Sequence, residues 1–357
     1  MGSEIRSGAP DATGGAAAGA GDARPGDGPI DGDDGTGAAG SEAAAPVDEL
    51  LRRAGAARPL PEGLRALAAS VGRTPLLPLP SPSDDVRILG KAEWTNPGGS
   101  VKARPARAMV LEAWAEGRLP DCRLLDASSG NTAIAYATLG AAGGFGVTLC
   151  VPESASRERL RSLRALGAEL VLTDPVEGSD GAIRRARELA REEPDRFWYA
   201  DQYGNPANPR AHERTTGPEI LRQTGGRVTH LVAGLGTTGT LVGAGRRLKE
   251  RDPGIRVVGV EPATPLHGIE GLKHLETAIR PPIFDPSVPD RRIGIATERA
   301  QEAARRLARE AGLLAGVSSG AAWAAARDVA REIGEGTVVA VLADAGDRYL
   351  SQDWWDG

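Results

Sequence analysis

Residues 96–102, Asn-Pro-Gly-Gly-Ser-Val-Lys, place a lysine where its amine could act as a nucleophile. A strand-like run over 87–93 precedes this segment, and a helix-like run over 104–116 follows it. Free N–H groups and positive potential at the start of a helix lower the pKa of a nearby, partly desolvated lysine. A neutral Lys102 amine can form a Schiff base with an aldehyde. The same pattern also fits a surface lysine after a Pro-Gly turn.

Two further segments have the composition of anion-binding loops. Residues 236–240, Gly-Thr-Thr-Gly-Thr, follow a strand-like run and open a helix, so their N–H groups can surround a phosphate. Residues 128–132, Ser-Ser-Gly-Asn-Thr, cap another helix and offer hydroxyls and N–H groups to a carboxylate. An alternative stays open, because residues 234–239 also fit G-x-G-x-x-G and Glu261 stands where a Rossmann site has its ribose acid. Under this alternative, the loop would bind the cofactor NAD.

The order of these segments, together with Gly-Val-Ser-Ser-Gly at 316–320, resembles the pyridoxal-phosphate (PLP) enzymes of the cysteine synthase and cystathionine β-synthase family. The resemblance runs from about residue 72 to residue 351. Residues 215–220, Thr-Thr-Gly-Pro-Glu-Ile, and residues 223–227, Gln-Thr-Gly-Gly-Arg, are most similar to the B-type cysteine synthases. Each motif alone is weak, but several in the right order make a specific signal.

The resemblance implies a role for each candidate residue. Lys102 holds the cofactor aldehyde, exchanges it with the substrate amine and then moves the Cα proton. The cofactor phosphate is expected at Gly236, Thr237, Thr238, Gly239 and Thr240, and the cofactor 3′-oxygen at Asn131. The substrate carboxylate is expected at Ser128, Ser129, Gly130, Thr132 and Gln202, and Gly268 is expected to line the closing site.

Three positions depart from the family pattern or bear on the substrate. Ala103 follows the lysine, where relatives commonly have Asp. Ala345 stands where many relatives offer a serine hydroxyl to the pyridine nitrogen, so the partner of that nitrogen stays open, with Asp344 as one candidate. Lys273 lies where phosphoserine-using relatives carry a cation, and Arg280 could assist it. This favours O-phosphoserine, the alternative being a solvated loop lysine.

The implied reaction is β-replacement on an activated L-serine, either O-acetylserine or O-phosphoserine. The substituent leaves, an α-aminoacrylate remains, and a sulfur nucleophile (sulfide or a sulfur-carrier thiocarboxylate) adds to give L-cysteine. Four alternatives stay open: a non-sulfide nucleophile in specialised amino-acid biosynthesis, a serine or threonine dehydratase, a non-catalytic partner protein, and an NAD-binding protein. A cytoplasmic homodimer is expected.

The elements that must position these residues alternate between short apolar runs and helical patterns. Such alternation predicts an α/β fold in which helices flank parallel sheets and ligands bind at the carboxyl ends of the strands. The resemblance implies two lobes, each with a mostly parallel twisted sheet (fold type II). We expect the smaller lobe, with the lysine and the carboxylate loop, at 85–205. The larger lobe, with the phosphate loop, is expected at 46–84 plus 206–353.

The expected elements follow from the same patterns. Strands are predicted at 87–93, 123–127, 147–151, 169–173, 230–233, 256–260 and 338–342. Helices are predicted at 104–116, 132–142, 156–166, 180–192, 209–223, 238–250, 297–311 and 320–332. Residues 262–294 are rich in Pro and Gly and are expected to be irregular, which is typical of functional loops.

Composition excludes several classes of protein. Residues 1–45 are mainly Gly, Ala and Asp, so we expect a disordered tail, and they lack the pattern of a signal peptide. This tail has a net charge of −6 and the whole chain −5, so the near-neutral remainder, at about +1, has no footprint for nucleic acid. No apolar run reaches the roughly 18 residues that span a membrane. Cys122 and Cys150 lack a CxxC partner, and the four histidines lack ligand spacing, so we expect neither a disulfide nor a metal site.

Overall fold

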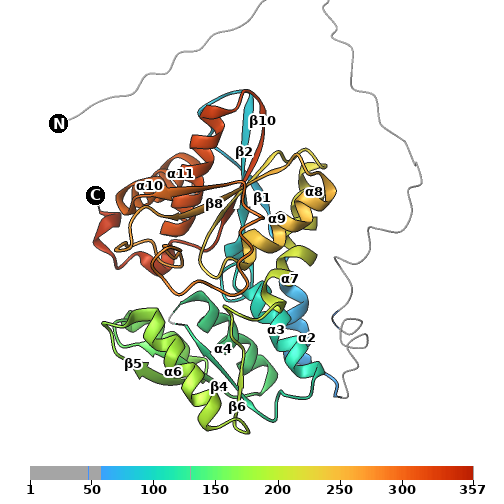
Figure 1. The fold of residues 1–357 in the computed structure, drawn as a ribbon, viewed down its shortest axis with the longest axis vertical. Coiled ribbons are helices and arrows are strands. Elements are labelled where there is room, and N and C mark those ends of the chain that lie inside the picture. Colours follow the sequence, from blue (N-terminus) through green and yellow to red (C-terminus); the bar gives the residue numbers. More distant parts are fainter. Residues whose placement is uncertain (1–46, 48–57, 129, 357) are drawn as a thin grey trace, which may run out of the picture. The chain divides into compact units, whose positions relative to one another are not determined.

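The computed structural model describes residues 47, 58–128 and 130–356 and contains two separate β-sheets (Figure 1). The predicted tail at 1–45 lies outside the described residues. The ten strands of the described part are β1 (Leu76–Leu79), β2 (Val86–Ala92), β3 (Arg123–Ala127), β4 (Val147–Pro152), β5 (Glu169–Thr173), β6 (Phe197–Tyr199), β7 (His230–Gly234), β8 (Arg256–Pro262), β9 (Arg291–Ile295) and β10 (Gly336–Leu342). The helices are α2 (Glu62–Ser70), α3 (Ala103–Ala115), α4 (Asn131–Gly143), α5 (Arg157–Ala165), α6 (Gly178–Glu192), α7 (Ala207–Arg214), α8 (Thr216–Thr224), α9 (Gly239–Arg251), α10 (Thr297–Ala311) and α11 (Val317–Glu332).

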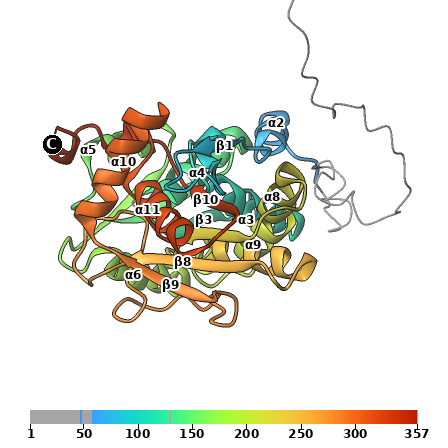
Figure 2. The same ribbon diagram turned by 90° about the horizontal axis from the view of Figure 1, so that it is seen from above.

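The larger sheet has six strands in the order β1-β2-β10-β7-β8-β9 and is parallel except for the antiparallel edge strand β1. Successive residues of a strand face opposite sides of a sheet. Val338, Ala340 and Leu342 of β10 therefore join one apolar core, with α10 and α11. Val339 and Val341 join a second core, with α9. Seen from above, these helices lie on the two sides of the sheet (Figure 2).

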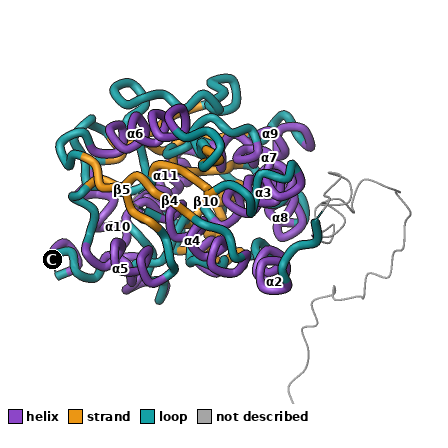
Figure 3. Tube along the Cα trace, turned by 90° about the horizontal axis from the view of Figure 1, so that it is seen from below, coloured by secondary structure: helices purple, strands orange, loops and turns teal. Residues whose placement is uncertain are grey.

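The smaller sheet has four parallel strands in the order β5-β4-β3-β6. Leu124 and Leu149 pack toward α3, α4 and α5, whereas Leu125 and Cys150 pack toward α6. Figure 3 shows α6 on one side of β4 and β5, with α4 and α5 on the other. Both sheets are thus covered on both faces, which confirms the predicted α/β fold class.

The structure corrects the predicted start of the smaller lobe at residue 85. Strand β2 lies within the six-stranded sheet, between β1 and β10, and pairs with β10 over its whole length. Six of its seven residues are buried, as expected for a strand covered on both faces. The chain therefore passes to the four-stranded half only after β2, through the segment that carries Lys102.

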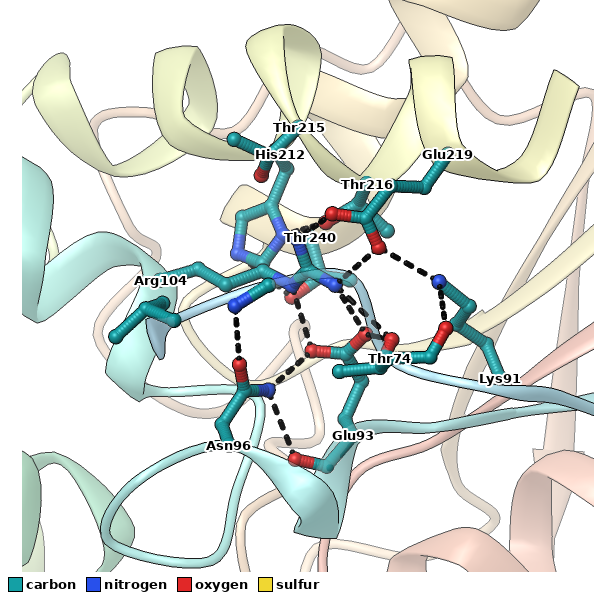
Figure 4. A network of polar contacts seen from close by, with 12 residues as sticks. Thr74, Lys91, Glu93, Asn96, Arg104, His212, Thr215, Thr216, Glu219 and Thr240 are labelled. Carbon is teal, nitrogen blue, oxygen red and sulfur yellow. Dashed lines mark hydrogen bonds and ion pairs between the residues drawn. The ribbon is translucent and has the colours of Figure 1, made fainter. Parts of the chain in front are cut away.

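The prediction of one helix at 209–223 was wrong, because the structure contains two helices there. Helix α7 ends at Arg214 and α8 begins at Thr216, with Thr215 outside helical geometry at φ −127° and ψ −62°. Pro218 explains the break: it has no N–H for a bond to Arg214, but it fits the first turn of a new helix. The break gives α8 its own direction and places Glu219 toward α3 (Figure 4).

Three further observations concern the described residues. Among the helices of that part, none is long and apolar enough to cross a membrane. Its acidic, histidine and cysteine side chains form no group of three or more that could hold a metal ion. Cys150 is a buried free thiol, and Cys122 is a free thiol that is partly exposed.

Candidate active site

Lys102 lies at the junction of the two halves of the fold. It precedes the first residue of α3, and its neighbours are tied to the chain after β10: the Val101 N–H donates to the Ala343 carbonyl over 2.8 Å, and Ser100 pairs with Asp344 in an isolated bridge. Arg348 also donates to the Gly98 carbonyl over 2.5 Å. The segment that leads to Lys102 is therefore held in place by residues near the end of the chain.

The side-chain amine of Lys102 makes no hydrogen bond or ion pair with any residue that the structure describes. Burial lowers the pKa of this amine, and the charges of Asp344 and Glu93 only partly oppose the effect. A partly buried amine without a partner is costly unless a ligand uses it. This environment fits the nucleophile or base predicted from the sequence.

A small pocket brings six of the predicted residues together. Its lining includes Lys102, Asn131, Gly236, Thr237, Thr238 and Thr240, as well as the unpredicted Val101, Gly234, Gly271, Leu272, Ser318, Val341 and Ala343. Gly239 is the next residue of the loop and begins α9. Ser318 was missed although its motif at 316–320 was noticed, because a serine at a helix start is also an ordinary cap residue.

The loop at 236–240 has the features of a phosphate cradle. Thr238, the N-cap of α9, has a left-handed backbone at φ 72°, and its buried hydroxyl has no partner among the described residues. A Cβ on Gly236 would lie 2.1 Å from the Gly271 carbonyl oxygen, and one on Gly239 would lie 2.0 Å from Asn208 Oδ1. Only glycine fits at these two positions. An open hydroxyl at the N-terminus of a helix suits an anion, so the residues fit the phosphate of the expected cofactor.

His212 connects this loop to the helices behind it. Its Nε2 lies 3.2 Å from Thr240 Oγ1, and its Nδ1 lies 2.9 Å from Thr216 Oγ1. Burial, together with the positive charges of Arg104 and Lys102, lowers the pKa of His212 well below its usual value. The imidazole is therefore neutral at pH 7, so one ring nitrogen donates and the other accepts.

A buried charged cluster consists of Lys91, Glu93, Arg104 and Glu219 (Figure 4). Arg104 donates to Glu93 over 2.7 Å and to Glu219 over 2.8 Å, and Lys91 donates to Glu219 over 2.7 Å. Burial alone would raise the pKa of Glu219, but Arg104 and Lys91 outweigh it and lower that pKa to about 2. Two cations and two carboxylates thus neutralise one another and join α3 to β2 and α8.

Asn131 is held from both sides by residues near the end of the chain. Its Nδ2 donates to Asp344 Oδ2 over 2.8 Å, and its Oδ1 accepts from Arg348 over 2.6 Å. Tyr349 donates to the same Asp344 oxygen over 2.5 Å, whereas buried Asp344 Oδ1 has no partner among the described residues. Burial raises the pKa of Asp344 despite these hydrogen bonds. Arg348 and Tyr349 were not predicted as site residues.

The residues predicted to bind the substrate carboxylate form a second group, at the end of the four-stranded sheet. Ser128 Oγ accepts from the N–H groups of Gly130 and Ala133, which orders the turn into α4. Thr132 donates to Gln202 Oε1 over 2.7 Å. Ser129 lies outside the described residues.

Three further predicted residues belong neither to the pocket nor to the group expected to bind the carboxylate. Gly268 is exposed and donates to Thr297, and Ala345 pairs with Ala315 in an isolated bridge. Lys273 is buried and donates to Asp180 of α6 over 3.1 Å. It thereby connects the irregular segment after β8 to the four-stranded half, with its charge already neutralised.

The alternative hypothesis, that residues 234–239 and Glu261 bind NAD, has little support in the geometry. Glu261 was its ribose-binding candidate, but Glu261 is ion-paired with Arg292 at 3.2 Å and accepts from the Leu275 N–H. Both carboxylate oxygens are therefore in use within the protein. The loop at 236–240 instead faces Lys102 across one pocket.

Comparisons with known proteins agree with this geometry. Residues 67–344 match the model of the family described as pyridoxal-phosphate dependent enzyme. The chain is 48% identical to a cysteine synthase of Aquifex aeolicus, covering 79% of this chain and 89% of that protein. It is 42% identical to cysteine synthase B of Pseudomonas aeruginosa, covering 81% and 97%. The crystal structure of a cysteine synthase (OASS) from Entamoeba histolytica superposes with a TM-score of 0.77 at 35% identity, covering 82% and 90%.

Proposed function

Because this chain belongs to the pyridoxal-phosphate-dependent enzymes, as its sequence motifs predicted, we propose that it replaces the β-substituent of an activated L-serine with sulfur to give L-cysteine. The observation that carries the proposal is the pocket in which the free amine of Lys102 faces the loop at 236–240. That amine has no structural task among the described residues. When bound, PLP supplies a ring that withdraws electrons from the Cα of the amino acid.

The pocket residues divide the binding of the cofactor among them. The N–H groups of the loop at 236–240 and the open hydroxyl of Thr238 hold the phosphate at the positive end of α9. The amide of Asn131, fixed by Asp344 and Arg348, would bind the ring oxygen. Ser318, which lines the pocket, would offer the ring nitrogen a hydroxyl in place of the one missing at Ala345. A neutral hydroxyl suits departure of a β-substituent better than transamination.

Lys102 acts as the base that removes the Cα proton. Its lowered pKa keeps a larger share of the amine neutral near pH 7, so it can accept a proton. Ser128, Thr132 and Gln202 would hold the substrate carboxylate. Departure of the β-substituent then opens the β-carbon to the sulfur nucleophile.

The contacts of Lys273 favour a donor whose β-substituent is uncharged before it leaves, that is, O-acetyl-L-serine. The sequence favoured O-phosphoserine because Lys273 could meet a phosphate. Lys273 already neutralises Asp180 at 3.1 Å and lies 5.0 Å from the ring centre of Tyr203. A phosphate would have to displace that carboxylate, whereas an acetyl group needs no cation.

The test is the reaction of the purified protein loaded with PLP. With O-acetyl-L-serine and sulfide it should form L-cysteine and acetate, measured by mass spectrometry. Without sulfide, pyruvate should form far more slowly. Rapid pyruvate production with no cysteine would indicate a dehydratase instead, and no reaction with either activated serine would contradict the proposal.

Three finer features remain predictions. The sulfur source is sulfide, with a sulfur-carrier thiocarboxylate as the alternative, and parallel assays with the two donors decide between them. A homodimer is expected from the family resemblance, and light scattering measures its mass. Cytoplasmic location is checked by fractionating cells that express the protein.

A further inference from the structure

Asp126 of β3 is a buried carboxylate that the reaction described above does not use. It has no exposed surface and forms no ion pair with any residue in the described ranges. The buried Glu93 and Glu219, by contrast, both contact Arg104. An unpaired buried charge is costly, so its presence calls for a reason other than packing.

Three neutral donors surround this carboxylate. The Ala127 N–H donates to Asp126 Oδ1 over 2.7 Å. The Tyr136 hydroxyl and the Gln202 N–H donate to Oδ2 over 2.9 Å and 3.1 Å. A carboxylate accepts all three bonds, whereas an asparagine would turn its NH₂ group toward one of these donors. The position therefore requires an acid rather than its amide.

The three donors come from three separate segments. Ala127 leads into the loop with Ser128, Tyr136 lies on α4, and Gln202 follows β6. These segments carry the side chains that we propose for the substrate carboxylate. One buried group therefore fixes their positions relative to one another.

Gln202 extends the network toward the rest of the site. Its Oε1 accepts from Thr132, and its Nε2 donates to the Ala127 carbonyl over 2.8 Å. Its carbonyl accepts from Asn208 over 2.7 Å, and Asn208 also donates to Thr237 over 3.1 Å. A shift of Gln202 would thus disturb the carboxylate loop first and the phosphate loop only through Asn208.

We propose that Asp126 is a positioning residue for the substrate carboxylate: it does not touch the ligand, but it fixes Gln202 and the loop at 128–132 in their binding arrangement. The inference rests on the proposed function, because it assigns an amino-acid carboxylate to that loop. Burial raises the pKa of Asp126 to about 7, although all three hydrogen bonds favour the ionised form. This carboxylate is therefore retained at a cost in stability, as positioning groups at binding sites often are.

The test compares two ligands on the PLP-loaded enzyme by calorimetry. L-Serine has the amine and the carboxylate but a poor leaving group, and L-serinamide lacks the carboxylate charge. Asp126→Asn should raise the Kd of L-serine about tenfold, equivalent to one charge-assisted contact, and change that of L-serinamide by less than about twofold. Tyr136→Phe removes one of the three donors, so it should raise the Kd of L-serine about threefold and again spare L-serinamide.

Leu163→Ala is the matched control, because Leu163 is fully buried in the same half of the fold and takes no part in the hydrogen bonds of Asp126. It should lower stability and leave the ratio of the two Kd values unchanged. Equal weakening of both ligands by Asp126→Asn, or no weakening of either, would overturn the inference. If Asp126→Asn does not fold, Tyr136→Phe decides by the same criterion. Wild-type enzyme that binds neither ligand would overturn the proposed function and the inference with it.

Discussion

The charged cluster and the pocket both use residues of the segment from Glu93 to Arg104. They differ in whether their polar side chains have partners within the protein. In the cluster, Arg104 and Lys91 are fully buried, and each is paired with a carboxylate. In the pocket, Lys102 and the hydroxyl of Thr238 lack any partner among the described residues. The cluster is complete without a ligand, and the pocket is not.

This difference indicates that the cluster contributes mainly to stability and the pocket mainly to activity. Two residues along the chain from Lys102, Arg104 anchors the first turn of α3 to β2 and α8 with bonds that are strong in a low dielectric. The cluster can therefore hold the start of α3 in place while the lysine side chain itself stays free. Changes in the cluster should cost stability, and changes in the pocket should cost activity.

The largest expected effect is that of Lys102→Ala on turnover. Loss of the base should lower kcat by roughly 10²- to 10⁴-fold. Unfolding in urea should change little, since the amine has no partner to lose. Steady-state kinetics and urea titration measure the two quantities. A variant that retains wild-type kcat would remove Lys102 from the mechanism.

Arg104→Met should have the opposite profile. It leaves Glu93 and Glu219 without their shared cation, so the free energy of unfolding should fall by roughly 3 to 5 kcal/mol. Arg331→Met is the control, because Arg331 pairs with Asp328 at the exposed surface and should change stability by less than about 1 kcal/mol. Similar losses in both variants, measured by urea titration, would contradict the role given to the cluster.

Glu219 of the cluster and Asp126, beside the carboxylate loop, should give stability opposite dependences on pH. The pKa of Glu219 is lowered to about 2, so its contribution to stability is present above its unfolded pKa of about 4.5 and is lost as pH falls toward 2. The pKa of Asp126 is raised to about 7, so the native state binds the extra proton and stability declines as pH rises from about 4 to 7.

Urea titrations over this pH range test both signs. The stability difference between wild type and Glu219→Gln should shrink as the pH falls below 5, to a maximum change of about 3 kcal/mol. Asp126→Asn should remove a decline between pH 4 and 7. If the free energy of unfolding varies with pH in the same way in wild type and both variants, the pKa of Glu219 is not lowered and that of Asp126 is not raised.

The smallest expected effect concerns the choice of donor. Asp180→Asn removes the carboxylate that neutralises Lys273, so kcat/KM for O-phosphoserine should rise about tenfold relative to O-acetylserine. Adding Lys273→Ala to that variant should abolish the gain. If the ratio of the two donors is the same in wild type and Asp180→Asn, Lys273 does not meet the leaving group.

The central parts of both sheets could be predicted from the sequence. The bounds of β3 match the prediction, and those of β4 and β7 differ from it by one residue, because buried parallel strands are continuous apolar runs. The missed strands β1, β6 and β9 all lie at sheet edges. Pro78 interrupts β1, and Arg291 and Arg292 begin β9. Such residues belong on edges, and they also hide the strand pattern.

The site could be predicted only where a motif and its position in the fold coincide. Lys102, Asn131 and the loop at 236–240 follow strand ends, so the pocket contains them. Asp344 was considered only as a partner of the pyridine nitrogen, and Arg348 was not assigned to the site, because their contacts with Asn131 join residues more than 200 positions apart. The partner of Lys273 was missed for the same reason, since Asp180 is 93 positions away.

The position of β10 between β2 and β7 has a consequence for the newly made chain. The four-stranded sheet is complete once β6 has emerged from the ribosome, whereas the six-stranded sheet lacks an inner strand until Gly336–Leu342 is synthesised. Domains generally fold in the order of synthesis. Ala343 and Asp344, which hold the segment before Lys102, emerge later still. We therefore expect the nascent chain to acquire a folded half early and its reactive lysine pocket only at the very end of translation.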